Sequence, residues 1–357
     1  MQEPLDPRRE RSMTEIKLLA IDLAKRVFQL HGVDASGAKV LERRLMRDQL
    51  EPFVAALPAC EIAMEACGSA HDWGRRFTAL GHRVRLLPPP EVARLVDRRK
   101  KNDWRDARAI ALAARLEHVR PVPLKSAEAQ AEQFEHRRRA QLIKARTGAI
   151  NLLRAMLLEF GIAVPKGPES LKRRRAGVMA SAAFGAIPPG CQTLAVDLFD
   201  QIDAHNAAVA VADRRIGALV KQRPASRLLL TIPGIGPLNA SAAPAAIPDI
   251  RAYANGRAFA AALGLVPKQN SSGEKVVLGS ITKRGNRYLR TLLVHAGRAV
   301  LVKARRTENP QDGLLVWAKR LLRRMHWNRA AVALANKLAR IVWAVLAFNQ
   351  PYRPRPL

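Results

Sequence analysis

The stretch that decides the fold is residues 17–34, KLLAIDLAKRVFQLHGVD. It predicts two extended segments, 17–23 and 27–33, joined by a short connection. The apolar run LLAI is typical of a central strand that is buried on both faces, and Asp22 follows that run directly. A buried aspartate is costly unless a cation neutralises it, so this position predicts a metal ion or a partner cation. Taken alone, Asp22 is better explained by a turn cap or by an ion pair with Lys25.

The segments that follow this hairpin predict a mixed α/β domain. Further strands are expected at residues 38–46, 60–64 and 82–87, and helices at 48–57, 71–80 and 103–118. Gly81 directly after the second helix is a common signal for a helix C-terminus. Strands and helices in this order favour a mixed sheet covered by helices.

Two long helices are predicted in the middle of the chain. Residues 127–160 contain no proline and a single glycine, and their apolar residues recur with a helical period. In the second segment apolar positions step by alternating threes and fours, which predicts a coiled-coil seam: Ala195, Leu198, Ile202, His205, Val209, Ala212, Ile216 and Leu219. We interpret His205 as a partly exposed seam residue rather than a ligand. The two helices are expected to form an antiparallel arm, either a dimer contact or a basic strut along nucleic acid.

The last third of the chain contains two segments suited to phosphate binding. Residues 228–237, LLLTIPGIGP, have the form of a helix-hairpin-helix turn, whose N–H groups at a helix N-terminus hold a phosphate without reading sequence. An ordinary Gly-Pro turn is the alternative. Residues 280–290, SITKRGNRYLR, predict a helix from Asn286. The nucleic-acid-binding residues expected here are Gly234, Ile235, Gly236, Lys283, Arg284, Arg287 and Arg290, the last two one turn apart on one face. Two amphipathic helices are expected after them, at 314–324 and 329–348.

The charge balance predicts a polyanionic partner. The 357 residues include 61 Lys and Arg against 30 Asp and Glu, a formal net charge of +31. Solubility does not need such an excess, and runs at 98–101, 137–139 and 172–175 distribute it along the chain. This distribution favours a long nucleic-acid track over a single basic tail.

Cysteine usage and hydropathy predict a cytoplasmic protein. The three cysteines form no CxxC pair and no even disulfide set, which is typical of a reducing compartment. Residues 1–14 are polar, without the apolar core of a signal peptide, and are expected to be a disordered basic terminus. The most apolar segment, 341–348, is too short to span a bilayer, so no membrane association is expected.

Four carboxylates stand at the ends of separate predicted elements. Asp22 ends the first strand, Glu65 follows the fourth, and Asp103 and Asp106 lie three residues apart at the start of a helix. Oxygen ligands suit Mg²⁺, and two ions bridged by carboxylates polarise a phosphodiester for in-line attack. Each acid alone has a simpler interpretation, as a helix cap or a surface residue. Together, in a chain of this charge, they predict a Mg²⁺-dependent enzyme acting on nucleic acid.

Six motifs resemble one known family. AIDLAK (20–25), MEACGS (64–69) and KNDWRDA (101–107) resemble the three acidic blocks of the DEDD transposases of bacterial insertion sequences. TIPGIGP (231–237), together with LGLVPKQNSSG (263–273) and SITKRGNRYLR (280–290), resembles that family's second domain. The resemblance covers roughly residues 15–125 and 225–300, in the family's order. Cys67 stands where threonine is usual, and Thr282 where serine is common.

The resemblance implies more than the residues alone. It implies an α/β ribonuclease-H-like (RuvC-like) domain at 15–125 that binds Mg²⁺, a helical coiled-coil region at 126–222, and a mainly α C-terminal transposase domain at 223–348 before a tail at 349–357. It implies that Ser272, next to Ser271, is a nucleophile that forms a covalent phosphoserine link to DNA. It also implies DNA donor and target substrates, a structured guide RNA, homodimers that pair into tetramers, and a nucleoid-associated location in the cytoplasm.

Three rival functions remain open at the level of sequence. A junction-resolvase-like nuclease would use the four acids and water, without a serine. A sugar-kinase-like ATPase shares the first strand and its aspartate, although the sequence has no convincing glycine-rich adenosine site. A non-catalytic nucleic-acid-packaging protein would not need the acids at all.

Overall fold

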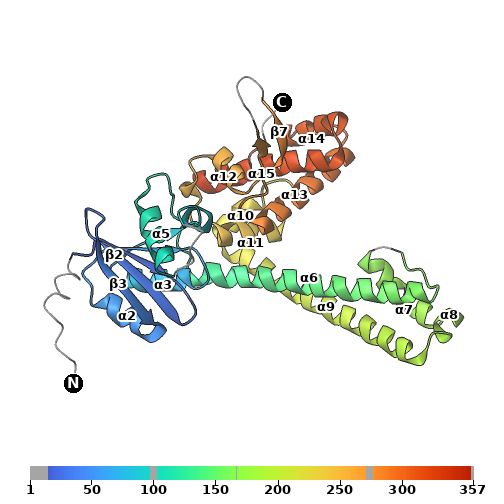
Figure 1. Cartoon of the computed structure of the whole chain (residues 1–357). Helices are drawn as coiled ribbons and strands as arrows, with labels where there is room; N and C mark the ends of the chain where they lie inside the picture. The colour runs from blue at the N-terminus through green and yellow to red at the C-terminus, as the bar shows by residue number, and fades with distance from the viewer. Residues whose placement is uncertain (1–14, 97–102, 166, 271–275, 355–357) are drawn as a thin grey trace. The chain divides into compact units, whose positions relative to one another are not determined.

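The computed structural model describes residues 15–96, 103–165, 167–270 and 276–354, with the backbone alone at positions 103, 104, 168 and 169. The chain divides into two compact units, residues 1–128 and 129–357, each of which is described by itself (Figure 1). The first unit ends close to the predicted limit of the α/β domain. Helix α9 (Pro189–Gln222) packs against the C-terminal helices α10 (Pro224–Leu229) and α11 (Pro237–Ala246), and the predicted limit at residue 222 stays a prediction.

A five-stranded mixed sheet forms the centre of the first unit, with the strand order β3-β2-β1-β4-β5. The strands are β1 (Leu18–Asp22), β2 (Val27–Val33), β3 (Lys39–Met46), β4 (Glu61–Glu65) and β5 (Arg83–Leu87). β2 is antiparallel to β1 and β3, whereas β4 is parallel to β1 and β5. The hairpin predicted from residues 17–34 is confirmed. β1 is the middle strand, with its apolar residues buried, which explains its uninterrupted apolar run.

Helices cover both faces of this sheet. On one face lie α2 (Arg47–Ala55) and α3 (Ala70–Ala79), whose Trp73 and Phe77 are buried against the strands. On the other face lies α5 (Asp103–Arg115). The buried side of α5 is made mostly of small residues, Ala107, Ala109, Ile110, Ala111, Ala113 and Ala114. Small side chains let the helix approach the strands closely, which brings its first turn near the strand ends.

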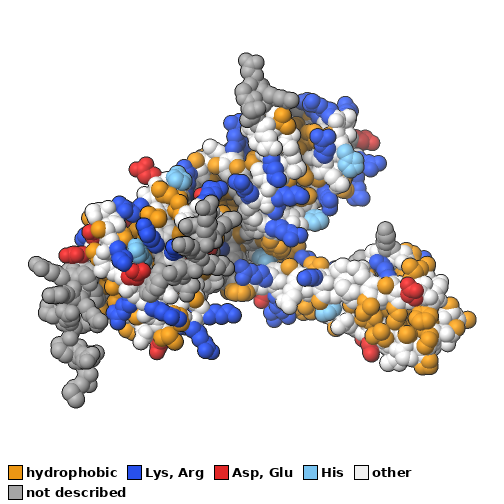
Figure 2. All heavy atoms as spheres, in the orientation of Figure 1, with side chains coloured by type: hydrophobic (Ala, Val, Ile, Leu, Met, Phe, Trp, Pro, Cys, Tyr) orange, Lys and Arg blue, Asp and Glu red, His pale blue; other side chains and the backbone are white. Residues whose placement is uncertain are grey.

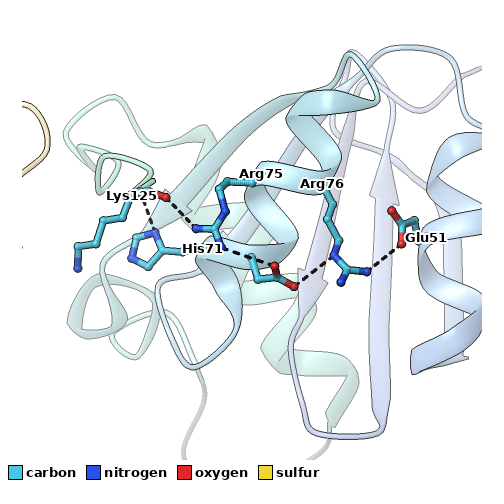
Figure 3. Close-up of polar contacts among 6 residues, drawn as sticks. Glu51, His71, Arg75, Arg76 and Lys125 are labelled. Atoms are coloured by element: carbon cyan, nitrogen blue, oxygen red, sulfur yellow. Dashed lines mark hydrogen bonds and ion pairs between the residues drawn. The ribbon is translucent and has the colours of Figure 1, made fainter. Parts of the chain in front are cut away.

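Polar contacts fix helix α3 on two sides (Figure 3). The backbone N–H of Lys125 donates to Nδ1 of His71 at 3.3 Å, and Arg75 donates to the carbonyl of Lys125 at 2.8 Å. Burial lowers the pKa of His71 to about 4, with the charges of Lys125 and Arg75 adding to the effect, so the neutral ring accepts this bond. On the other side Arg76 pairs with Glu51 of α2 at 3.0 Å. Because α3 follows β4, these contacts hold the backbone that leaves that strand.

The predicted pair of long helices is confirmed as an antiparallel arm within the second unit. The helical arm consists of α6 (Ala127–Glu159), α7 (Pro168–Met179), α8 (Ala182–Gly185) and α9. Polar side chains join α6 to α9 and to its C-cap at successive levels: Glu132 with the C-cap Arg223, Arg139 with Asp213, and Arg146 with Asn206. The residues of the predicted seam are buried except His205 and Leu219. At the end of the seam Val220, rather than Leu219, is the buried residue. His205 is half-buried, as predicted; coiled-coil geometry stays a prediction.

The C-terminal core is helical, with a small hairpin. Beside α10 and α11 its elements are α12 (Gly256–Ala262), β6 (Pro267–Gln269), β7 (Leu278–Ile281), α13 (Arg287–Arg306), α14 (Gly313–Arg324) and α15 (Trp327–Phe348). α13 and α15 pack so closely that a Cβ on Gly297 would lie 2.4 Å from the carbonyl oxygen of Ala331.

Helix α15 is longer than the apolar segment 341–348 that the sequence analysis considered. Among the described residues it is the one helix long and apolar enough to cross a membrane by length and composition. One side of it lies in the hydrophobic core, where Leu334, Leu338 and Val342 are buried and the helix packs against α13 and α12. Burial in a core of this kind accounts for much of its apolar composition.

Candidate active site

Two carboxylates end neighbouring strands at one edge of the sheet. Asp22 is the last residue of β1, and Glu65 is the last residue of β4. The two strands are parallel, with Ile21 opposite Met64, so Asp22 and Glu65 are the next residues along and reach the same edge. Ile21 and Met64 belong to the apolar cluster under α2 and α3. Because side chains alternate along a strand, Asp22 and Glu65 are directed to the other face, which α5 covers.

Helix α5 adds Asp106 to this neighbourhood. Burial raises the pKa of Glu65, and the negative charge of Asp106 raises it further. Burial likewise raises the pKa of the Cys67 thiol, and the charges of Glu65 and Asp22 add to that effect. Asp106 thus affects Glu65, and both Glu65 and Asp22 affect Cys67, so carboxylates from three elements act electrostatically near this sheet edge. Asp22 and Glu65 therefore end neighbouring parallel strands, with Asp106 close enough to affect Glu65, and a shared site for these acids stays a prediction.

The fourth predicted acid, Asp103, begins α5 one turn before Asp106, but its side chain lies outside the described residues. Among the described side chains, no three His, Cys, Asp or Glu groups are placed to hold a metal ion as they stand. The donor set nonetheless fits a hard divalent cation, because every candidate ligand is a carboxylate oxygen. Burial first, and the charge of Asp106 second, raise the pKa of Glu65, and a bound cation would offset both effects.

The predicted helix-hairpin-helix turn joins α10 to α11. Gly234 has φ +82°, and a Cβ there would lie 2.6 Å from the carbonyl oxygen of Ala296 in α13, so only glycine fits. The N–H of Ile235 donates to the carbonyl of Ile232 at 3.1 Å, and the Ile235 side chain is buried. Ile235 therefore has an internal role and offers no group to a phosphate. Gly236 is the N-cap of α11.

A cationic turn precedes helix α13. Asn286 caps the helix by accepting the N–H of Leu289 at 3.1 Å, close to the predicted helix start. Lys283, Arg284 and Arg287 are exposed around this N-terminus, where free N–H groups favour anions.

Arg290, predicted to lie with Arg287 on a binding face, is engaged within the protein. Its guanidinium donates to the carbonyls of Leu263 at 3.0 Å and Arg284 at 2.7 Å. These bonds tie the cationic turn to the end of α12. We therefore assign Arg290 to holding the turn rather than to contacting nucleic acid.

Ser271 and Ser272 lie outside the described residues, between two described strands. β6 pairs antiparallel with β7, and the N–H of Asn270 donates to the carbonyl of Val277 at 3.0 Å. The hairpin thus brings the two flanks of the serine segment together.

Comparisons with known proteins agree along nearly the whole chain. A sequence profile described as "Transposase IS116/IS110/IS902 family" matches residues 226–311, and a DEDD profile of the IS110 type, described as "Transposase", matches residues 19–162. The "Probable family 20 transposase" of Pseudomonas aeruginosa is 45% identical over 337 residues, which cover 94% of this chain and 98% of the relative. This chain belongs to the IS110-type DEDD transposases of insertion sequences. The transposase is also 39% identical over 346 residues to the "Transposase for insertion sequence element IS1111A" of Coxiella burnetii, covering 97% of this chain and 94% of that protein.

Family membership confirms the recognition made from the motifs and shows that the chain is a DNA transposase. It excludes the sugar-kinase-like and packaging alternatives. The mixed α/β first unit and the helical C-terminal region agree with the predicted fold class.

The transposase also contains a buried polar network that the sequence analysis missed. His136 of α6 is 3% exposed; its Nδ1 lies 3.0 Å from the Tyr288 hydroxyl, and its Nε2 lies 3.1 Å from the Ser241 hydroxyl. Burial lowers the pKa of His136 to about 4, and the charge of Arg139 lowers it further, so the ring is neutral. One nitrogen then donates and the other accepts, which fixes α6 against α11 and the first turn of α13. In the sequence, His136 lies at a helical spacing from the apolar positions of α6, and this spacing was the signal that could have indicated its burial.

Proposed function

We propose that the transposase cuts and rejoins DNA strands through a magnesium-binding cluster of Asp22, Glu65, Asp103 and Asp106 and through a covalent link to Ser272. The observation that carries this proposal is the meeting of Asp22 and Glu65 on adjacent parallel strands with Asp106 close enough to raise the pKa of Glu65. Carboxylates held together at such a cost are a common feature of sites that bind divalent cations.

The cluster would hold Mg²⁺ by carboxylate oxygens. Bound Mg²⁺ supplies positive charge that stabilises the developing charge on a phosphodiester and lowers the pKa of an attacking hydroxyl. The protein's part is to place the ligands on strands and a helix rather than on loops. Burial beside β1 and β4 limits water at the site, which strengthens the interaction between the carboxylates and a cation.

Strand transfer through Ser272 consists of two transesterification steps. The Oγ of Ser272 attacks phosphorus, a P–Oγ bond forms, and one P–O bond to deoxyribose breaks. The serine proton passes to a base, and the released deoxyribose oxygen gains a proton. A hydroxyl of the incoming strand then attacks the phosphoserine and frees the serine, so the bond energy is conserved. Ser271 is the adjacent alternative nucleophile.

A basic surface supports the choice of nucleic acid as partner. Lys283, Arg284 and Arg287 surround the N-terminus of α13, and Gly234 and Gly236 shape the hairpin turn beside α11. On the face shown in Figure 2, Lys and Arg side chains are spread over both units. We assign these groups to DNA phosphates and to a structured guide RNA.

We further propose that the first unit is a RuvC-like domain of the ribonuclease H type, which its strand order supports. The domains run from 15 to 125, 126 to 222 and 223 to 348, and the protein acts at the nucleoid in the cytoplasm. Homodimers pairing into tetramers are supported by exposed apolar side chains on the helical arm, which gather at its far end in Figure 2. They include Leu152, Leu158, Phe160 and Leu194.

The test is recombination between a donor and a target plasmid, with variants of the acids and the serine. Asp22→Asn and Ser272→Ala are expected to abolish recombination, whereas Asp197→Asn, an exposed aspartate of α9, leaves it unchanged. Trapped wild-type reactions should contain DNA joined to protein that migrates as free DNA only after protease treatment. If Ser272→Ala still cuts DNA and no protein–DNA adduct forms, the chain instead uses water, as a junction resolvase does.

A further inference from the structure

A large groove crosses the C-terminal core and is not used by the proposed chemistry. Its volume is about 1910 Å³, and it is lined by one side of α15, the first turns of α12 and α14, the base of β7 and residues 350–353. Small-molecule pockets have volumes of roughly 300–1,000 Å³, so this groove suits a polymer.

Helix α15 lines the groove with a side that carries both apolar and basic residues. Ala333, Ile341, Ala344 and Phe348 line the groove, whereas the core side of the helix is buried beneath them. The Phe348 ring is 66% exposed. The groove side of α15 therefore combines these apolar residues with Arg329, Lys337 and Arg340, whereas the opposite side is covered by the core.

Aromatic rings face this groove, and two of them have their polar atoms bonded elsewhere. Its lining contains Trp317, Trp343, Phe348 and Tyr352. The Trp343 Nε1 donates to the carbonyl of Tyr253 at 3.0 Å, and the Tyr352 hydroxyl donates to Asp312 at 2.8 Å. Because these donors are satisfied, the rings offer a partner their apolar faces rather than hydrogen bonds.

The charge of the groove is entirely positive. The lining includes Arg257, Arg329, Lys337, Arg340 and Arg353, and it contains no aspartate or glutamate. Within the described part of the chain, Arg257, Arg329, Arg340 and Arg353 form no ion pair. Cations left without acidic partners beside apolar residues favour a ligand that is anionic along one side and apolar along the other.

We propose that this groove binds an unpaired strand of the DNA substrate. In a duplex the faces of the bases are stacked within the helix, and only phosphates and groove edges meet a protein. An unpaired strand exposes base faces, which stack on aromatic rings, and its phosphates meet basic side chains. The groove reaches the base of the β6–β7 hairpin at Gly279, Ser280 and Ile281, so the bound strand would pass that hairpin. This inference rests on the proposed strand-transfer function.

The test measures binding of the full chain to fluorescent oligonucleotides of about 12 nucleotides, a length that a groove of this class can cover. The probes are a single DNA strand, the same sequence as a duplex, and the same sequence as single-stranded RNA. The test variant is Trp317→Ala with Phe348→Ala. Phe134→Ala is the matched control, because Phe134 is also exposed, at 60%, but lies on α6. Circular dichroism and sedimentation confirm that each variant is folded and report its mass.

The proposal predicts that the double variant binds single-stranded DNA about tenfold more weakly, because stacked bases contribute strongly to such binding. Duplex binding and the Phe134→Ala control should match wild type. Equal loss on duplex and single strand, no loss on either, or tighter binding of the RNA strand would overturn the proposal. A drop in molecular mass would also overturn it, because the groove would then hold a second copy of the chain.

An Asp22→Asn variant separates this inference from the proposed function. Asp22 lies in the first unit and outside the groove, so this variant should bind the single strand as wild type does while it loses recombination. If Asp22→Asn recombines normally and the groove variant still loses single-strand binding, the magnesium mechanism fails and the groove assignment stands.

Discussion

The substitution Gly285→Ala tests how the cationic turn is held. Gly285 has φ +69°, a left-handed conformation, and a Cβ there would lie 1.8 Å from the carbonyl oxygen of Ala262 in α12. That oxygen belongs to the backbone of a helix and cannot move aside alone. The turn must therefore separate from α12, which breaks the bond from the Lys283 N–H to the carbonyl of Gly264 (3.2 Å) and the Arg290 bond to Leu263.

The magnitude follows from these interactions. A left-handed alanine costs about 1–2 kcal/mol. Each broken hydrogen bond adds about 0.5–1.5 kcal/mol, and more where a charged group takes part. With two hydrogen bonds broken, the central values of these ranges add to a destabilisation of about 3–4 kcal/mol. For a unit of residues 129–357, each kcal/mol shifts Tm by about 2–4 °C, so a decrease of about 6–16 °C is expected.

Thermal unfolding followed by circular dichroism measures this shift, with Gly148→Ala as the matched control. Gly148 lies in the middle of α6, and a Cβ there meets nothing within 4 Å. An exposed helical Gly→Ala change stabilises by about 0.5–1 kcal/mol, so the control should melt at a slightly higher temperature. Gly285→Ala should also bind duplex DNA more weakly, because Lys283 and Arg284 are displaced. A Tm equal to wild type would refute the packing described for this turn.

Two further predictions concern pH and salt. His136 has a pKa of about 4 in the folded protein, against an ordinary value of 6.5. The contribution of the neutral ring to the free energy of unfolding is therefore fully present above pH 6.5 and is lost as the pH falls towards 4. The loss of free energy of unfolding is about 3 kcal/mol. His136→Gln should therefore flatten the dependence of Tm on pH. The control His205→Gln should keep the wild-type dependence. When Lys283, Arg284 and Arg287 are all changed to Gln, the slope of log affinity against log salt concentration should become smaller. The slope should decrease by about 0.9 for each phosphate that is no longer neutralised, up to about 3. An unchanged slope would show that these side chains do not bind phosphates.

Local pattern was enough to predict the sheet edge. The apolar run before Asp22 and the corresponding run before Glu65 place both acids at strand ends, and alternation then directs them to one face. The spacing of Asp103 and Asp106 likewise follows from helix geometry. These features depend on neighbours in sequence, so periodicity predicts them well.

Features set by tertiary packing were not predicted. Arg290 resembles a nucleic-acid contact in sequence, yet its guanidinium binds carbonyls of α12 and the preceding turn. Ile235 is buried for the same kind of reason, because α13 covers the hairpin turn. The partners of His136 come from positions more than a hundred residues away, Ser241 and Tyr288, and no local pattern indicates them.

Titration of Glu65 by carboxyl NMR tests the central claim most directly, because that claim concerns the distance between carboxylates of different elements. In an Asp106→Asn variant the pKa of Glu65 should be lower than in wild type, since the charge of Asp106 contributes to raising it. Adding Mg²⁺ to the wild-type protein should lower the pKa of Glu65 as well, and should do so less in the variant. Identical titration curves for wild type and Asp106→Asn, with and without Mg²⁺, would show that the acids do not share a site.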